Sequence, residues 1–310
     1  MRPYTASRAV MRGDRAYLLD KTQNICYNKN ESCELLYGVY LEMKPNIIKV
    51  GKKNNIFQHI VVLKTNRYKR TEYGEFFVEG VHNIKLAIKH GWKVKNWIIT
   101  SHKLSSWATN IIQTIESEAV YCLSDNLLEE ISERSDGSEI MAILYMKQMS
   151  VQPSENPFIV LLDRPSKKGN LGTIMRSADA FGCDGIIITG HSVDIYDPEV
   201  LSASMGSFFG IPTQRIENND RISDYFVNLK NKYPNLAIVA TTELGEVNIR
   251  KFDFKQPVVL LVGNEAKGLS KFLLDICDKT VKIPMVGDAT SFNVANATSI
   301  FMYEIFTQRN

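Results

Sequence analysis

Cysteine is scarce in this chain and is nowhere arranged for chemistry. The sequence has no C-x-x-C pair and no H-E-x-x-H, and its five cysteines are scattered: Cys26, Cys33, Cys122, Cys183 and Cys277. Neither a zinc site nor a thiol-redox motif is therefore indicated, and no metal is predicted. Five is an odd number, which argues against a disulfide framework and favours a reducing compartment.

Long apolar runs are missing as well. No stretch approaches the ~18 apolar residues that a membrane span needs, and residues 1–14 lack the apolar core of a signal peptide. The chain is therefore expected to be cytoplasmic, with no membrane partner. Its 310 residues, 44% hydrophobic and 23% charged, are typical of a globular protein with two domains or one large one.

Positive charge is concentrated at the front of the chain. Residues 1–70 carry 14 Lys and Arg against 5 Asp and Glu, whereas residues 71–150 carry 7 against 11 and residues 151–310 carry 16 against 18. The basic part ends in a run around Tyr68 that consists of Lys64, Arg67, Lys69 and Arg70. Such asymmetry predicts a polyanionic partner, and we assign these four residues to RNA binding.

The chain divides into three parts. Residues 1–55 show no clear period and are predicted to form a basic N-terminal extension of unclear structure. From Phe76 onward strands alternate with helices, which predicts a small α/β domain over residues 56–150. The polar linker KQMSVQPSEN, residues 147–156, leads to a second α/β domain over residues 151–310. Its strands are continuous apolar runs, which favours a parallel sheet covered on both faces.

The first polar cluster lies in NLGTIMRSADAFG, residues 170–182. Leu171, Ile174 and Met175 begin a buried helical stripe, and Arg176 lies off it. Asn170 is placed either to cap this helix or to hydrogen-bond a ligand. By itself, this segment is equally typical of an ordinary helix with a surface arginine.

Two further clusters follow strands in the second domain. GNEAKGLS, residues 263–270, has the glycine spacing of a phosphate-binding loop, but Leu269 stands where the phosphate lysine belongs, so a nucleotide hydrolase is not indicated. No G-x-G-x-x-G is present either. The third cluster, residues 283–297, places Ser291 and Asn293 where they can bind a ligand or simply cap the last helix.

Taken together and in this order, the three clusters resemble the motifs of the SpoU (TrmH-like) RNA ribose 2′-O-methyltransferases of the SPOUT superfamily. The segments Asp197-Pro198 and Ala203–Ser207 also resemble this family, and Phe77–Gly80 resembles the start of its ribosomal-protein-like substrate-binding domain. The resemblance covers roughly residues 60–310. Phe292 stands where the family usually has leucine.

This resemblance implies a fold and a cofactor. The fold is α/β, with a C-terminal trefoil-knotted parallel-sheet methyltransferase domain preceded by a small α/β ribosomal-protein-like substrate-binding domain. The knot loops would hold S-adenosylmethionine in a tight homodimer. The residues that match the family's cofactor positions are Thr241, Gly263, Ile283, Met285, Phe292 and Ala297, and those that match its polar active-site set are Asn170, Arg176, Glu265, Ser291 and Asn293.

The implied reaction is methylation of a ribose 2′-hydroxyl in structured RNA, with ribosomal RNA favoured over transfer RNA. Because a guanidinium is effectively always protonated, we interpret Arg176 as a two-pronged clamp and electrostatic stabiliser rather than a base, entering the site from the partner subunit. Arg164, Lys167 and Lys168 are predicted to contact RNA phosphates near the site. Two alternatives stay open: a knotted methyltransferase that modifies another RNA atom, and a catalytically silent RNA-binding protein.

Overall fold

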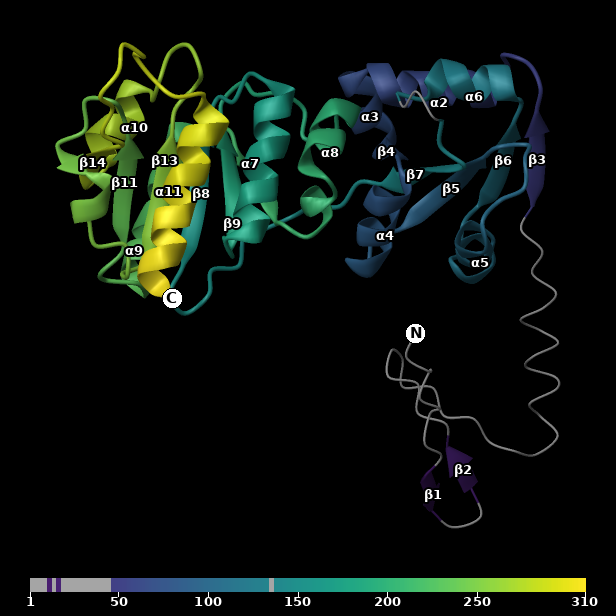
Figure 1. The fold of residues 1–310 in the computed structure, drawn as a ribbon, viewed down its shortest axis with the longest axis horizontal. Helices are drawn as coiled ribbons and strands as arrows, with labels where there is room; N and C mark the ends of the chain where they lie inside the picture. Colours follow the sequence, from purple (N-terminus) through teal and green to yellow (C-terminus); the bar gives the residue numbers. More distant parts are fainter. Residues whose placement is uncertain (1–9, 13–14, 18–45, 134–136) are drawn as a thin grey trace.

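A computed structural model describes residues 10–12, 15–17, 46–133 and 137–310 (Figure 1). Most of the basic extension predicted over residues 1–55 therefore lies outside the described residues. Within it, β1 (Val10–Arg12) and β2 (Arg15–Tyr17) form an antiparallel pair.

The first domain is a five-stranded mixed sheet with helices on its faces. Its strands, in the order β3-β6-β5-β7-β4, are β3 (Ile47–Val50), β4 (Glu75–Glu79), β5 (Val94–Ile99), β6 (Ala119–Leu123) and β7 (Ile140–Tyr145). Its helices are α2 (Asn55–Thr65), α3 (Arg67–Tyr73), α4 (Val81–Lys89), α5 (Ser106–Thr114) and α6 (Asp125–Ile131).

The predicted start of this domain at residue 56 is too late. Strand β3 pairs in parallel with β6, and Val50 is buried in the same core as Phe57 and Ile60 of α2. The sequence hides this strand because three of its four side chains are exposed or half-buried, so it lacks a clear alternation. Helices α2 and α3 were also not predicted. Asn66 ends the first and caps the second, its side chain accepting the N–H of Lys69.

The second domain is a seven-stranded sheet in which every pairing is parallel, as predicted. Its strands, in the order β10-β9-β8-β13-β11-β14-β12, are β8 (Phe158–Asp163), β9 (Gly185–Thr189), β10 (Thr213–Ile216), β11 (Ala237–Thr241), β12 (Val247–Asn248), β13 (Val258–Val262) and β14 (Lys279–Lys282). Its helices are α7 (Lys168–Ala180), α8 (Pro198–Ser204), α9 (Asn219–Lys232), α10 (Lys271–Ile276) and α11 (Val294–Arg309), with 3₁₀ turns at Ser207–Phe209 and Ile249–Lys251.

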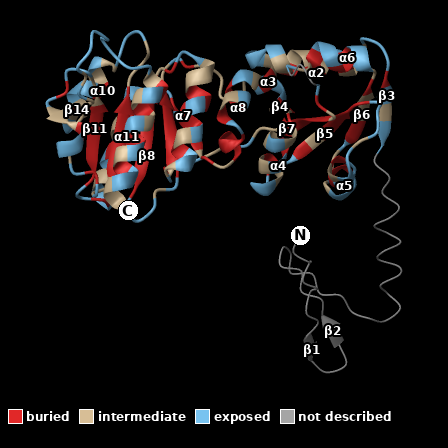
Figure 2. Ribbon diagram, in the orientation of Figure 1, coloured by how far each residue is buried: buried red, intermediate tan, exposed pale blue. Residues whose placement is uncertain are grey.

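Both faces of this sheet are covered, so strands β8, β9 and β13 are buried along their whole length, whereas β10, β12 and β14 are partly exposed (Figure 2). Alternate residues of β8 show the two layers. Val160 packs in one core with the apolar stripes of α7, α8 and α11, and Leu161 packs in the other with α9 and α10. Gly172 brings α7 close to α8, because a Cβ at this position would lie 2.5 Å from the carbonyl oxygen of Val200. The order of the strands is compatible with a threaded chain, and the trefoil knot itself remains a prediction.

The two domains share one core across their boundary. Residues 147–156, the predicted linker, contain no helix or strand. Beyond this linker, Trp92 of the first domain donates a hydrogen bond of 3.0 Å to the carbonyl oxygen of Phe209, and it packs beside Phe208 and Tyr196. Helix α8 and α3 meet at the junction, on the upper edge of the molecule in Figure 1. The first domain is thereby held in a defined position beside the second.

Candidate active site

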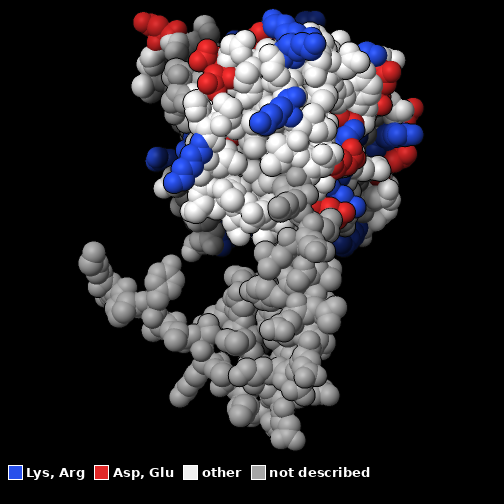
Figure 3. All heavy atoms as spheres, turned by 90° about the vertical axis from the view of Figure 1, so that its right-hand side faces the viewer, with Lys and Arg blue, Asp and Glu red and all other residues white. Residues whose placement is uncertain are grey.

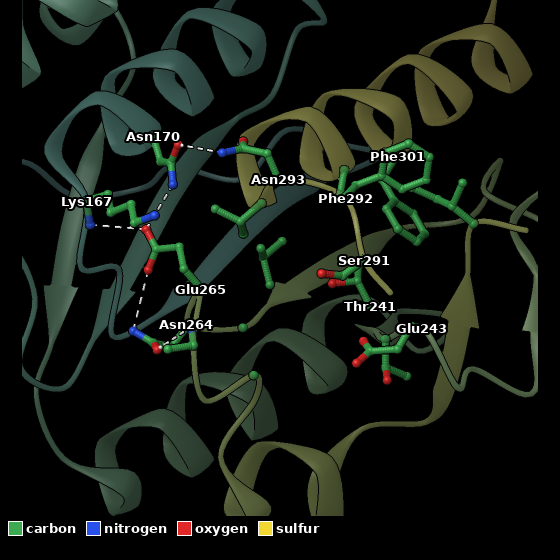
Figure 4. Close-up of a pocket in the computed structure, with 18 of the residues that line it drawn as sticks. Lys167, Asn170, Thr241, Glu243, Asn264, Glu265, Ser291, Phe292, Asn293 and Phe301 are labelled. Carbon is green, nitrogen blue, oxygen red and sulfur yellow. Dashed lines mark hydrogen bonds between the residues drawn. The ribbon is translucent and has the colours of Figure 1, made fainter. Parts of the chain in front are cut away.

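A polar cavity lies at the carboxyl edge of the seven-stranded sheet. Its volume is about 480 Å³, and its walls come from the segments that follow β11, β13 and β14 and from the start of α11 (Figure 4). A volume of this size is in the range of small-molecule and cofactor sites. Parallel strands end at one edge, so residues from separate segments of the chain meet here, as open α/β sheets bring them together.

Every residue predicted from the resemblance to contact the cofactor lines this cavity. They are Thr241, Gly263, Ile283, Met285, Phe292 and Ala297. Gly263 is needed for the wall itself. A Cβ there would lie 2.5 Å from the backbone of Gly268 and Leu269, which the chain brings back in an antiparallel bridge between Asn264 and Gly268.

Glu265 anchors this wall to the start of α7. One carboxylate oxygen accepts the backbone N–H and the hydroxyl of Ser166, at 3.0 and 2.6 Å, and the other accepts the backbone N–H of Lys167 at 3.0 Å and the side-chain amide of Asn170 at 3.2 Å. Burial raises the pKa of Glu265, but these hydrogen bonds outweigh it, so the pKa lies below its ordinary value. The carboxylate therefore stays ionised and acts as a cap for α7, which lacks a side-chain cap of its own.

Asn170 and Asn293 join α7 to α11. The side-chain amide of Asn293 donates to the side-chain oxygen of Asn170 at 3.1 Å, while its own oxygen accepts the backbone N–H groups of Ala295 and Asn296 (Figure 4). Asn293 is thus the cap of α11, as the sequence allowed, and a wall residue as well. Asn170 is not a cap, because α7 begins at Lys168. Ser291, the fourth polar residue predicted here, is exposed at the cavity wall.

Asp163 and Arg164 complete the edge at the end of β8. The guanidinium of Arg164 forms two hydrogen bonds with the Asp163 carboxylate, at 2.9 and 2.8 Å, and the same carboxylate accepts the N–H of Ser270 at 2.7 Å. Burial opposes ionisation of Asp163, but Arg164 and Ser270 hold its pKa below the ordinary value. Arg164 also donates to the carbonyl oxygen of Gly268 at 3.2 Å, which ties it to the loop at residues 263–268, and its RNA contact stays a prediction.

Arg176 is the one member of the predicted active-site set that does not line the cavity. It is exposed on α7, off the stripe that buries Leu171, Ile174 and Met175, as the period predicted. The next residue, Ser177, shares a 2.7 Å hydrogen bond with Ser299 of α11. Arg176 therefore lies beside the α7–α11 contact on the outer surface.

The basic run at residues 64–70 is dispersed by the fold. Arg70 is 1% exposed and pairs with Asp194 at 2.7 Å and Asp197 at 3.4 Å across the domain junction, so its predicted RNA contact is wrong. Lys64 donates to the carbonyl of Ile131. Figure 3 shows the end of the first domain, where some basic side chains stand apart among uncharged atoms and others lie beside acidic ones.

The other predicted RNA contacts keep some exposure. Arg67 is exposed and gives one nitrogen to the carbonyl of Ser192, and Lys69 is half-buried and pairs with Glu72. Lys167 lines the cavity, and its amino group makes no ion pair within the described residues. Lys168, next to it, pairs with Asp197 at 3.1 Å. The cations near the cavity are therefore few and separately placed.

Sequence reasoning missed part of the wall. Thr242 and Glu243, directly after β11, and Phe301, on the inner side of α11, also line the cavity. Their signal was position: Glu243 follows the carboxyl end of a parallel strand, where such sheets bind ligands. Phe301 falls two turns beyond Val294 on the same helix and was recognisable only as a core residue.

Within the described residues, no group of three or more His, Cys, Asp and Glu side chains is arranged to hold a metal ion. None of the described helices has the length and apolar character to cross a bilayer.

Two family models match the chain. One, described as the SpoU rRNA Methylase family, matches residues 157–303, and the other, described as the SpoU L30e-like domain, matches residues 54–142. The first match spans the whole seven-stranded sheet, and the second spans the five-stranded sheet except for β3 and the end of β7.

Individual relatives span nearly the whole described chain. A 23S rRNA (uridine(2479)-2′-O)-methyltransferase from Streptomyces viridochromogenes is 38% identical over 273 residues, which are 86% of this chain and 95% of the relative. The crystal structure of the SpoU methyltransferase AviRb from the same organism, in complex with AdoMet, superposes with a TM-score of 0.78 at 38% identity and covers 83% of this chain and 98% of that one. An AdoMet-bound rRNA methyltransferase from Sinorhizobium meliloti gives a TM-score of 0.74 at 30% identity, covering 84% and 97%.

Proposed function

Because the chain belongs to the SpoU rRNA Methylase family, we propose that its cavity transfers a methyl group from S-adenosylmethionine to a ribose 2′-hydroxyl of ribosomal RNA. The observation that carries this proposal is that the predicted site residues meet in one cavity. Ten of the eleven residues assigned to cofactor binding and catalysis from the resemblance line one cavity, although they come from five separate segments of the chain. With ribosomal RNA as the substrate, we propose that the reaction takes place in the cytoplasm.

The cavity fits the cofactor in size and in chemistry. Ile283, Met285 and Phe292 offer apolar and aromatic surface for a purine ring, and Phe301 closes the same wall. Glu243 and Thr241 offer oxygen acceptors for ribose hydroxyls on the opposite wall (Figure 4). When bound, S-adenosylmethionine supplies the electrophilic methyl group, and the chain has to hold and orient the attacking ribose beside it.

The polar wall is better suited to positioning than to proton removal. Glu265 has a lowered pKa and both of its oxygens are already bonded, so it is a poor base. Asn170 and Asn293 fix each other across the cavity mouth, which leaves the second lone pair of the Asn170 oxygen and the hydroxyl of Ser291 to hold a ribose. Arg176 remains our choice for the clamp on the adjacent phosphate and the stabiliser of the 2′-oxygen.

A homodimer is the arrangement in which Arg176 can act. The outer face of α11 exposes large apolar side chains next to Arg176: Ile300, Tyr303 and Phe306 are 36%, 57% and 40% exposed, and Phe181 of α7 packs against the two rings. Such a contiguous apolar face on a soluble domain is typical of a subunit interface. Pairing two copies through this face would bring Arg176 of one copy to the other, so we propose that the active site is completed by the partner subunit.

One experiment tests the proposal directly. The purified protein is incubated with S-adenosylmethionine and an unmodified 23S rRNA transcript, and the methyl group is located after digestion to nucleosides. A 2′-O-methyl nucleoside is expected. A methyl group on a base nitrogen would instead support a knotted methyltransferase of different specificity. Absence of both products, together with retained RNA binding, would indicate a catalytically silent RNA-binding protein.

Cofactor identity is tested separately by calorimetry. S-adenosylmethionine or its demethylated product should bind with micromolar-scale affinity, and ATP should not compete, because Leu269 replaces the phosphate-binding lysine. Tight ATP binding without binding of S-adenosylmethionine would contradict the assignment of the cavity.

A further inference from the structure

The basic side chains of helix α3 are largely engaged by other groups of the same chain, so little of their positive charge is free to bind a ligand. Arg70 is buried between two carboxylates, and the Lys69 amino group lies 2.8 Å from Glu72. Arg67 is exposed and has one nitrogen on the carbonyl of Ser192. The most prominent side chain left is Tyr68, which is 73% exposed.

The surface formed by Arg67, Tyr68 and Lys69, here called the α3 surface, is held rigidly. Asn66 caps the helix through the N–H of Lys69, at 3.1 Å. The Lys69 amino group lies 6.0 Å from the centre of the Tyr68 ring and 5.5 Å from that of Tyr73. A tyrosine on a capped helix has only two side-chain torsions to restrict, so the entropy cost of binding a flat partner on it is small.

The α3 surface is also fixed to the edge that carries the active site. Arg67 binds the carbonyl of Ser192, and Arg70 reaches Asp197, the same carboxylate that holds Lys168 at the start of α7. Lys167, the next residue, lines the cavity. In Figure 1, α3 and the loops that precede α11 lie along the same upper side of the molecule. An RNA strand in the cavity can therefore extend across the α3 surface.

We propose that Tyr68 stacks on an unpaired base of the RNA substrate, while Arg67 and Lys69 contact the flanking phosphates. The assignment rests on the proposed RNA substrate and adds a specificity: the enzyme requires a single-stranded nucleotide near the target ribose. Every base has a π face that an aromatic ring can cover, and a neighbouring cation reinforces the contact.

The composition of the surface favours an unpaired base over its competitors. A duplex is gripped through rows of phosphates, which needs several free cations, and the basic run has lost Arg70 to burial and Lys64 to the Ile131 carbonyl. A protein partner would be expected to use a contiguous apolar patch. Tyr68 has instead polar and charged neighbours, Arg67 and Lys69, that complement a phosphate backbone.

The test is equilibrium binding of the full chain to two RNA probes, a ten-nucleotide oligouridylate and a twelve-base-pair duplex. Tyr68→Ala should raise the Kd for the single strand about 5- to 150-fold, the range that loss of one stacked base produces. The Kd for the duplex should change less than about twofold. An equal loss for both probes, or no loss for the single strand, would overturn the proposal.

Matched variants separate stacking from other contacts. Tyr68→Phe keeps the ring and should bind the oligouridylate as the wild type does, whereas Tyr68→Leu keeps apolar bulk and should resemble Tyr68→Ala. Leucine behaving like phenylalanine would show a simple apolar contact and refute stacking. Val227→Ala, which truncates an exposed apolar side chain on α9, is the control and should have no effect. The salt dependence should be unchanged in Tyr68→Ala and reduced by about one in Lys69→Ala, because only the lysine displaces a counterion.

A kinetic measurement on the 23S rRNA transcript separates this inference from the proposed function. Tyr68→Ala should raise the KM for RNA and leave kcat within about twofold, with unchanged affinity for S-adenosylmethionine. If the wild type transfers no methyl group but single-strand binding depends on Tyr68, the proposed reaction fails and the stacking site stands. If methyl transfer proceeds and Tyr68→Ala has wild-type KM and probe affinities, the stacking site is refuted alone.

Discussion

The cavity wall and helix α3 arrange polar side chains in opposite ways. At the wall, Asn170, Glu265 and Asn293 come from segments far apart in the sequence and bond to one another. In α3, residues 67–70 are consecutive, yet Arg70 points into the domain junction while Tyr68 points to solvent. Strand ends of a parallel sheet gather side chains at one edge, whereas successive helical positions turn by about 100° and separate them.

The largest effect on methyl transfer is expected at Arg176. This residue lies on a helix, as the α3 residues do, but we assign it to catalysis together with the cavity wall. Arg176→Ala should abolish methyl transfer to the 23S rRNA transcript while S-adenosylmethionine still binds, because the side chain is exposed and supports no core contact. Arg176→Lys should also stay nearly inactive, since lysine keeps the charge but loses the planar fork. Substantial activity of the lysine variant, rising steeply with pH, would indicate a base instead of a clamp.

A substitution of Arg70 tests whether the buried residue of α3 stabilises the domain junction. Arg70→Ala leaves Asp194 without its cation and Asp197 with Lys168 alone, and it should lower the free energy of unfolding by about 3–5 kcal/mol. Denaturant unfolding of the full chain measures this. Lys69→Ala is the neighbouring control and should leave stability unchanged, since its amino group is on the surface. Equal stability of the two variants would contradict the structural role assigned to Arg70.

Glu265 tests whether the wall depends on a carboxylate cap. Glu265→Gln keeps the size but turns one acceptor into a donor that faces N–H groups, so it should cost about 0.5–2 kcal/mol and lower methyl transfer at saturating substrates. Because folding lowers the pKa of Glu265, its contribution is present above the ordinary pKa and is lost as the pH falls through the folded value. Thermal unfolding between pH 6 and pH 3 should show a smaller acid-induced loss in the glutamine variant than in the wild type.

The smallest effect is expected from removing residues 1–45. Those residues carry seven basic and five acidic side chains, whereas residues 46–70 carry seven basic and none acidic. The deletion should therefore change the salt slope of RNA binding by less than about two. A deletion to residue 70 is not equivalent, because it removes Phe57, Ile60 and Leu63 from the core. If the deletion of residues 1–45 instead removed most of the salt dependence of RNA binding, the N-terminal extension would be the main RNA-binding segment.

These comparisons also explain what sequence reasoning could reach. The parallel sheet was predictable because its apolar strands carry a strong local signal. Each short cluster after a strand was ambiguous by itself, and the cavity residues could be predicted only from the family resemblance of the three clusters together. Strand β3 and helix α8 were missed, since a four-residue strand with one buried side chain and a seven-residue helix give too little periodicity. The partners of Arg70 were invisible, because Asp194 and Asp197 lie more than 120 positions away. Charge can be counted in a sequence, but its exposure depends on contacts made across domains.

The order β8-β13-β11 has a consequence for synthesis on the ribosome. Strand β13 is the last of the three to be made, yet it lies between the other two. The edge of β8 that it covers stays open until about 100 further residues have been added, which takes roughly 5–20 s at ordinary elongation rates. During that interval a nascent chain presents unpaired apolar strand edges, the kind of surface that other chains can join. The enzyme that we propose to act on ribosomal RNA therefore cannot close its own central sheet until most of its chain has been made.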